Sequence, residues 1–293
     1  MNAGSPVSVW LLRGLWVLQP LAFVPLVSDS TSALPGAGRF IAAVIAWVAW
    51  AAVLLATLVP STVSLTAGRL AAPLPLAVVV VCALGPGAAG WEVAIAAAAG
   101  LVAVLVWFSG EIGGVLAQGS AYGAEQRFPL KPPVPYLAPM VVSWLLLAAT
   151  SMGAATSLAN ELWIVGIGLA AITAAVAVFV APRFHQLARR WLVVVPVGVV
   201  VHDPMLLAEN ALFRTGALLA LHLAPADTEA ADLSGGAAGT AVEIVLREMD
   251  TVVKIGSRVQ PTGVALHVRS VLVSPTRPGR ALAAAAARNM PVG

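Results

Sequence analysis

The most constraining feature of this chain is a series of apolar runs that are long enough to cross a membrane. Residues 40–59 read FIAAVIAWVAWAAVLLATLV and contain no ionisable side chain. A helix that spans the hydrocarbon core of a bilayer needs about 20 such residues, and its backbone polar groups are all satisfied within the segment. The same interpretation applies to residues 70–84, 91–108, 134–150 and 162–181.

The first apolar run, residues 7–27, is less uniform because it contains Arg13, Gln19, Pro20 and Pro25. It either spans the bilayer, with Arg13 reaching the headgroups, or lies in the interface. The sequence therefore predicts a membrane all-α helical bundle of six transmembrane helices, with five as the alternative.

The distribution of charge divides the chain into two parts. Of all residues, 60% are hydrophobic and only 10% are charged, whereas a soluble domain carries about 25% charge. Charged residues are sparse up to Ala181 and become frequent from Arg183 onward. We therefore expect a polytopic transmembrane domain over residues 1–190 and a soluble domain over residues 191–293, which is a normal domain size.

The positions of lysine and arginine predict the orientation in the membrane. In the six-span scheme one side holds only Arg39. The other side holds Arg69, Arg127, Lys131, Arg183, Arg189 and Arg190. Because short cytoplasmic loops carry the excess of basic residues, both termini are predicted to be cytoplasmic.

The soluble part shows the pattern of a small α+β domain with mainly antiparallel strands. Residues 191–201 (WLVVVPVGVVV) predict two short strands joined at Pro196 and Gly198. Residues 217–223, 241–248 and 264–273 predict further strands. A single C-terminal helix is expected after Ser274-Pro275-Thr276-Arg277-Pro278, since serine or threonine before proline is a typical helix start.

No catalytic, cofactor-binding or metal-binding constellation is evident in the sequence. Glu92, Glu111 and Glu161 lie at the ends of predicted spans, where water can solvate them, and none has a histidine or base at a suitable spacing. The four histidines never fall at ligand spacings. The net charge of +3 is too small to argue for nucleic acid. We therefore predict no catalytic residues, no cofactor, no metal and no nucleic-acid partner.

Residues 109–133 form an unusually long connection between two apolar runs, and its polar part lies in the stretch AYGAEQRFPLKPPVP, residues 121–135. Helix–helix connections normally take about 2–8 residues, and longer ones tend to be functional or disordered. We predict that this loop contacts the soluble domain, with Arg127 or Lys131 meeting the acidic residues 203–232. The candidate contact residues are Tyr122, Glu125, Arg127, Phe128 and Lys131.

The last part of the chain carries basic residues without acidic ones. A basic face near the inner leaflet would gain about 1 kcal/mol per base from anionic lipid. The alternative is a surface on which the signs mix once the chain folds. The candidate lipid-facing bases are Lys254, Arg258, Arg269, Arg277, Arg280 and Arg288.

Two resemblances add to these observations. Residues 271–288 (VLVSPTRPGRALAAAAAR) resemble the last strand, proline-rich corner and capping helix of bacterial pleckstrin-homology-like domains. This resemblance implies a cytoplasmic PH-like β-rich domain that serves in binding or assembly without fixed catalytic residues. Tyr122-Gly123-Ala124-Glu125-Gln126-Arg127-Phe128-Pro129-Leu130 is similar to a loop of actinobacterial membrane proteins. This second resemblance implies a location in a bacterial plasma membrane and no particular activity.

Three functions remain open on the sequence alone. The first is a non-enzymatic scaffold or accessory subunit that recruits a protein partner, a further copy of itself or lipid. The second is a transporter or channel component. The third is a membrane enzyme that acts on lipid and uses Glu111, but Glu111 and Glu125 lack the spacing of a divalent-metal site.

Overall fold

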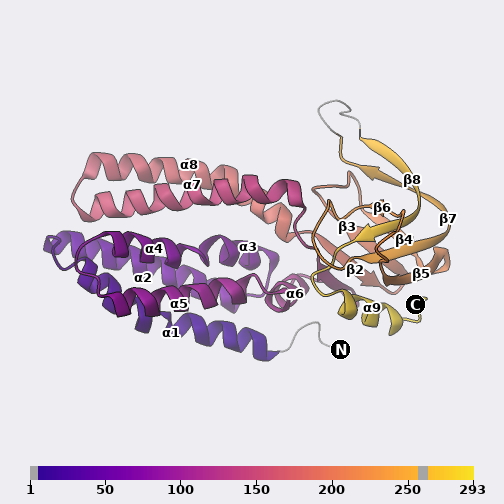
Figure 1. The fold of residues 1–293 in the computed structure, drawn as a ribbon, viewed down its shortest axis with the longest axis horizontal. Coiled ribbons are helices and arrows are strands. Elements are labelled where there is room, and N and C mark those ends of the chain that lie inside the picture. Colours follow the sequence, from indigo (N-terminus) through magenta and orange to yellow (C-terminus); the bar gives the residue numbers. More distant parts are fainter. Residues whose placement is uncertain (1–5, 257–262) are drawn as a thin grey trace. The chain divides into compact units, whose positions relative to one another are not determined.

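A computed structural model describes residues 6–256 and 263–293 of the chain. It contains two compact units, which Figure 1 shows as a group of long helices and a group of sheets. The helical unit comprises the described residues up to Val115 together with Met140–Phe184. The globular unit comprises Leu116–Pro139 and His185–Gly293, so it includes a stretch that precedes the last two long helices.

The described part of the chain has six helical segments that are long and apolar enough to cross a membrane. The segment predicted over residues 7–27 is helical throughout, although it contains Pro20 and Pro25. The helices are α1 (Pro6–Ser30), α2 (Gly36–Leu58), α3 (Thr62–Ala71) followed by α4 (Leu74–Leu84), α5 (Gly90–Trp107), α7 (Val134–Ala159) and α8 (Trp163–Ala188). The shorter helix α6 (Gly110–Gln118) follows α5.

The third segment begins earlier than the sequence predicted and is interrupted. Helix α3 starts at Thr62, where the Ser61 side chain accepts a hydrogen bond from the Ser64 amide and caps the helix. The helix is interrupted at Ala72 and Pro73 before α4 begins. Arg69 therefore lies within a helix, not in a loop, and its Nε donates to the Trp107 carbonyl.

Polar contacts between apolar helices organise the helical unit. The Trp16 indole donates to the Trp50 carbonyl at 3.0 Å, and the Trp50 indole donates to the Trp16 carbonyl at 2.8 Å. Arg13 donates to the Thr57 carbonyl, where α2 ends and its last carbonyls lack helical partners. These bonds join α1 to α2 and give hydrogen-bond partners to polar groups that lipid hydrocarbon could not bond.

The globular unit consists of two four-stranded sheets and one helix. The first sheet has the order β1-β2-β3-β4, with antiparallel neighbours throughout. The second has the order β5-β7-β8-β6, in which only the β6–β8 pair is parallel. The strands are β1 (Gln126–Pro129), β2 (Trp191–Val195), β3 (Gly198–His202), β4 (Ala211–Arg214), β5 (Leu218–Leu223), β6 (Ala231–Asp232), β7 (Val242–Lys254) and β8 (Val264–Val273); a 3-10 turn, η1 (Thr215–Ala217), precedes β5, and α9 (Pro278–Ala286) follows β8.

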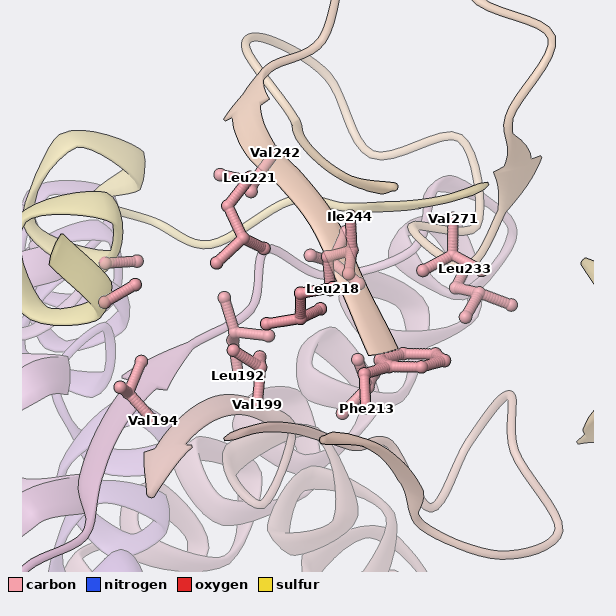
Figure 2. Packing of buried hydrophobic residues seen from close by; sticks show 14 of the residues in the cluster. Leu192, Val194, Val199, Phe213, Leu218, Leu221, Leu233, Val242, Ile244 and Val271 are labelled. Carbon is pink, nitrogen blue, oxygen red and sulfur yellow. The ribbon is translucent and has the colours of Figure 1, made fainter. Parts of the chain in front are cut away.

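One apolar core fills the space between these two sheets. Leu192 and Val199 point from the first sheet toward Leu218 and Ile244 of the second (Figure 2). Ala281 and Ala285 of α9 belong to the same buried cluster. The strands predicted on either side of Pro196 and Gly198 are confirmed, and so is the C-terminal helix.

Candidate functional site

The long polar loop contributes a strand to the globular unit. Its residues 126–129 form β1, which pairs with β2 in the register Gln126↔Val194 to Pro129↔Trp191. Phe128 points into the core and is 9% exposed, whereas Arg127 lies on the other face of the sheet. The first sheet thus contains strands from both ends of the α7–α8 hairpin.

Arg127 is held by groups on both sides of it in the chain. Its Nη2 lies 2.6 Å from Glu125 Oε1, and its guanidinium carbon lies 4.7 Å from the centre of the Trp191 ring. The Gln118 side chain accepts from the Arg127 amide and donates to the Glu125 carbonyl. The Tyr122 amide donates to Glu125 Oε1, and Tyr122 as a whole residue is 82% exposed.

Lys131 meets carbonyl oxygens of the globular unit. Its Nζ donates to the Ala238 carbonyl at 2.9 Å, and its amide donates to the Ser274 carbonyl at 2.8 Å. Arg127 therefore contacts Glu125, Gln118 and Trp191, and Lys131 contacts main-chain oxygens; no described contact joins either base to a carboxylate of residues 203–232.

The acidic segment contributes Asp203 to a different arginine. Arg190 and Asp203 form a bidentate pair, with Nε to Oδ1 at 2.8 Å and Nη2 to Oδ2 at 2.6 Å, and both side chains are 0% exposed. Arg190 also donates to the Lys131 carbonyl, and its own carbonyl accepts from Leu130. The pair therefore joins the loop, the start of β2 and the turn after β3. The sequence signal for this pair is an arginine at the junction of an apolar helix and a strand, a position that by itself indicates only orientation in the membrane.

His202 lies beside this pair in a half-buried position. Its ring stacks on Trp191 with centroids 5.2 Å apart, and its Nδ1 lies 2.6 Å from Asn210 Oδ1. Burial lowers the pKa of His202 below its usual value, and this effect outweighs the hydrogen bond to Asn210, which raises it. Its buried Nε2 has no hydrogen-bond partner among the described residues.

The predicted basic residues are distributed over several elements. Arg288, beyond α9, donates to the Ala124 carbonyl of the loop, and Lys254 Nζ donates to the Asp232 carbonyl at 2.9 Å. Arg269 is exposed on β8, Arg277 and Arg280 lie at the start of α9, and Arg258 lies outside the described residues. In Figure 1 the end of β7 and the start of β8 lie on the opposite side of the globular unit from α9. The bases that the structure describes are thus spread around this unit.

The carboxylate of Asp232 binds the amides of the glycine-rich turn that follows this residue. Its carboxylate accepts from the amides of Ser234 at 2.6 Å and Gly236 at 3.0 Å. Burial acts to raise the pKa of Asp232, but the bonds from Ser234 and Gly236 and the charge of Lys254 lower it overall. The amides of this turn are therefore engaged by the chain's own carboxylate.

Within residues 6–256 and 263–293, no three histidine, cysteine, aspartate or glutamate side chains are grouped so that they could hold a metal ion. Comparison with known proteins found no matching family model, no similar curated protein and no similar solved structure. The argument for function consequently rests on the geometry of the chain itself.

Proposed function

We propose that this chain is a non-enzymatic integral membrane protein, a scaffold or accessory subunit whose globular unit binds a protein partner at the cytoplasmic face of a bacterial plasma membrane. The observation that carries this proposal is the pairing of β1 with β2 across the α7–α8 hairpin. Residues 130–133 alone separate β1 from α7, and Arg189 and Arg190 alone separate α8 from β2. A binding unit connected this closely to two apolar helices stays at the membrane surface, as recruitment to a membrane requires.

The same pairing supports the topology. Because β1 and β2 are hydrogen-bonded neighbours, the chain before α7 and the chain after α8 lie on one side of the membrane. Helices α7 and α8 then cross as a pair, and six crossings in total return both termini to that side. The excess of lysine and arginine there makes this side cytoplasmic.

Cysteine labelling tests this orientation. In a Cys82→Ser background, single cysteines replace the exposed residues Ser32, between α1 and α2, and Ala226, in the globular unit. We expect a membrane-impermeant maleimide to label Ser32→Cys in intact spheroplasts and Ala226→Cys only after permeabilisation. The reverse pattern would contradict the proposed orientation.

Affinity purification in a mild detergent tests the binding role. We expect a protein to co-purify in fixed stoichiometry with the full chain and to be lost from a chain that ends at Ala188. Purification of the chain alone, without any stoichiometric partner, would overturn the scaffold proposal.

A transporter or channel component is the second candidate, because the third apolar segment is discontinuous at Ala72 and Pro73. Broken helices mark substrate sites in many transporters. Against this, the hydroxyls of Ser64 and Thr66 are bonded to the Val59 and Thr62 carbonyls. Altered uptake of a solute in a deletion strain, restored by the wild-type chain, would favour this candidate. The lipid-enzyme alternative is weaker because Glu125 is engaged by Arg127.

We further propose that the globular unit is a PH-like domain and that its bases bind anionic lipid headgroups. The two facing sheets and the single C-terminal helix support the first part, and the exposed Arg269 and Arg280 support the second. Flotation of the globular unit alone, made as described in the Discussion, with vesicles of neutral or anionic lipid tests the lipid proposal. Equal flotation with both vesicle types would contradict it.

A further inference from the structure

Two sheet edges in the globular unit border one cleft. Strand β4 is the last strand of its sheet, so one of its sides is unpaired. Strand β7 pairs with β5 only from Val242 to Leu246, and on this side its later residues have a single bridge, between Lys254 and Leu207. Between these edges lies an open cleft of about 100 Å³, which is lined by residues 209–213 and 250–253.

The cleft continues an existing ladder at the point where that ladder opens. Ala208 donates its amide to the Val253 carbonyl, and Ile255 donates to the Leu206 carbonyl, both at 2.9 Å. These two bonds belong to one antiparallel register, marked by the Leu207↔Lys254 bridge. The next hydrogen-bonded pair in that register would be Asn210 and Thr251, but the Thr251 amide bonds instead to Asp250 Oδ1 at 2.8 Å.

The direction of the β4 amides follows from its pairing with β3. Thr215 donates to the Val197 carbonyl at 2.9 Å, and Phe213 lies opposite Val199 in the same register. Bonded and non-bonded pairs alternate along antiparallel strands. The amide and carbonyl of Leu212 therefore point away from β3 and toward the cleft.

The chemistry of the cleft favours a basic occupant. Glu209 and Asp250 bring carboxylates to its lining, and no lysine or arginine lines it among the described residues. Two exposed apolar side chains flank it, Leu212 at 40% and Met249 at 71% exposure. An unpaired strand edge adds an extended chain through main-chain bonds, and neighbouring side chains supply the specificity.

We propose that this cleft binds an extended segment of a partner protein that alternates apolar residues with lysine or arginine. The segment pairs with the free edge of β4 at Leu212, and its basic side chains meet Glu209 and Asp250. This assignment rests on the proposed binding function and names the chemistry of the partner.

The test measures peptide binding to the purified full chain in neutral detergent by fluorescence anisotropy. The probe is a labelled, end-capped Val-Lys-Val-Lys-Val-Lys-Val peptide. Two comparison peptides replace lysine with glutamate or carry methyl groups on alternate backbone nitrogens. We expect the lysine peptide to bind and both comparison peptides to bind at least about tenfold more weakly.

Variants of the chain locate the site. Leu212→Pro removes an amide that points to the cleft, so the β3–β4 ladder keeps its bonds, and we expect affinity to fall at least about tenfold. Asp250→Asn should also weaken binding. Asp227→Asn, at an exposed position away from the cleft, should not. Unchanged thermal unfolding of each variant shows that the globular unit still folds.

Several results would overturn the proposal. These are no binding of the lysine peptide, equal binding of its N-methylated form, or equal affinity in Leu212→Pro. A change from dimer to monomer in the peptide-free Leu212→Pro chain would instead identify a second copy as the occupant. If a native complex persists in Leu212→Pro, the binding function stands and only the cleft assignment fails.

Discussion

At the scale of single residues, the buried Arg190–Asp203 pair joins separate parts of the globular unit. It is fully enclosed, and Arg190 also bonds to the loop through the Lys131 carbonyl. A buried ion pair adds little over a well-packed apolar pair, but removal of one partner leaves an uncompensated charge in the interior. The importance of the pair is therefore best measured by breaking it.

We expect Asp203→Ala to destabilise the globular unit by about 3–5 kcal/mol. The reason is that the Arg190 guanidinium would lose its counterion and the Met205 amide would lose its acceptor. Hydrogen exchange of the β2 and β3 amides in the full chain measures the effect. Asp227→Ala, at an exposed position, is the matched control and should change stability by less than about 0.5 kcal/mol. The double variant Arg190→Met with Asp203→Leu should recover part of the loss; equal protection in Asp203→Ala and wild type would contradict this account.

His202 predicts a dependence of stability on pH. Burial lowers its pKa in the folded state, so below the unfolded value of about 6.5 the unfolded chain binds a proton more readily than the folded chain. The stability of the globular unit should therefore fall as pH decreases from about 6.5 toward the folded pKa. The lowered pKa of Asp232 acts only below about 4, outside this range.

Thermal unfolding of the full chain at pH 7.5 and 5.5 measures this effect. His202→Gln should reduce the difference between the two pH values, and His267→Gln, on the exposed face of β8, is the comparison. If the difference is the same in His202→Gln and wild type, the pH dependence arises elsewhere.

At the scale of elements, the sequence predicts the long apolar helices and the β-branched strands, but it does not predict the brief strand β1. Residues 40–59 could only be an apolar helix, and the β-branched run after Trp191 could only be read as strands. Pattern alone does not predict strand β1, because Gln126–Pro129 is brief and contains a proline, and its partner lies across the whole α7–α8 hairpin. Lys131 was expected to meet carboxylates, but pattern and composition do not reveal which main-chain oxygens a fold exposes.

Helix α3 packs closely against α5 through a glycine. A Cβ placed on Gly68 would lie 2.0 Å from Cζ3 of Trp107, whose ring is fully buried. We expect Gly68→Ala to destabilise the helical unit by about 1–3 kcal/mol, because the ring cannot move without displacing its neighbours. The fraction of protein that remains monodisperse after heating in detergent measures this.

Gly14→Ala provides the matched control, since nothing lies within 4 Å of the added Cβ in α1. It should leave heat resistance unchanged or slightly raise it, because alanine favours a helix over glycine by about 1 kcal/mol. Equal heat resistance of both variants would show that the contact between Gly68 and Trp107 is not tight.

At the scale of the whole molecule, the division of the chain does not follow its order. Residues 1–190 and 191–293 were the expected domains, yet the globular unit also contains Leu116–Pro139. A composition shift marks where apolar sequence ends, but it does not show that an earlier loop completes a later sheet. The α7–α8 hairpin is in effect an insertion between two neighbouring strands. The first sheet therefore forms only after both helices have been synthesised.

This arrangement predicts that a fragment beginning at Trp191 does not fold properly, because it lacks part of the globular unit. Residues 191–293 alone lack β1 and Phe128, which leaves the β2 edge unpaired and the core open. They also lack Arg190, which leaves Asp203 without its partner.

Residues 116–133 joined by a short glycine–serine linker to residues 189–293 should restore β1, Phe128 and Arg190. The linker can be short because the Leu130 amide lies only 3.0 Å from the Arg190 carbonyl. We expect the joined version to be monomeric, with a cooperative thermal transition and little binding of a hydrophobic dye, and the shorter fragment to aggregate or bind the dye strongly. A monomeric residue 191–293 fragment with an equally cooperative transition would show that β1 is dispensable and would remove the main support for a globular unit fixed to the membrane helices.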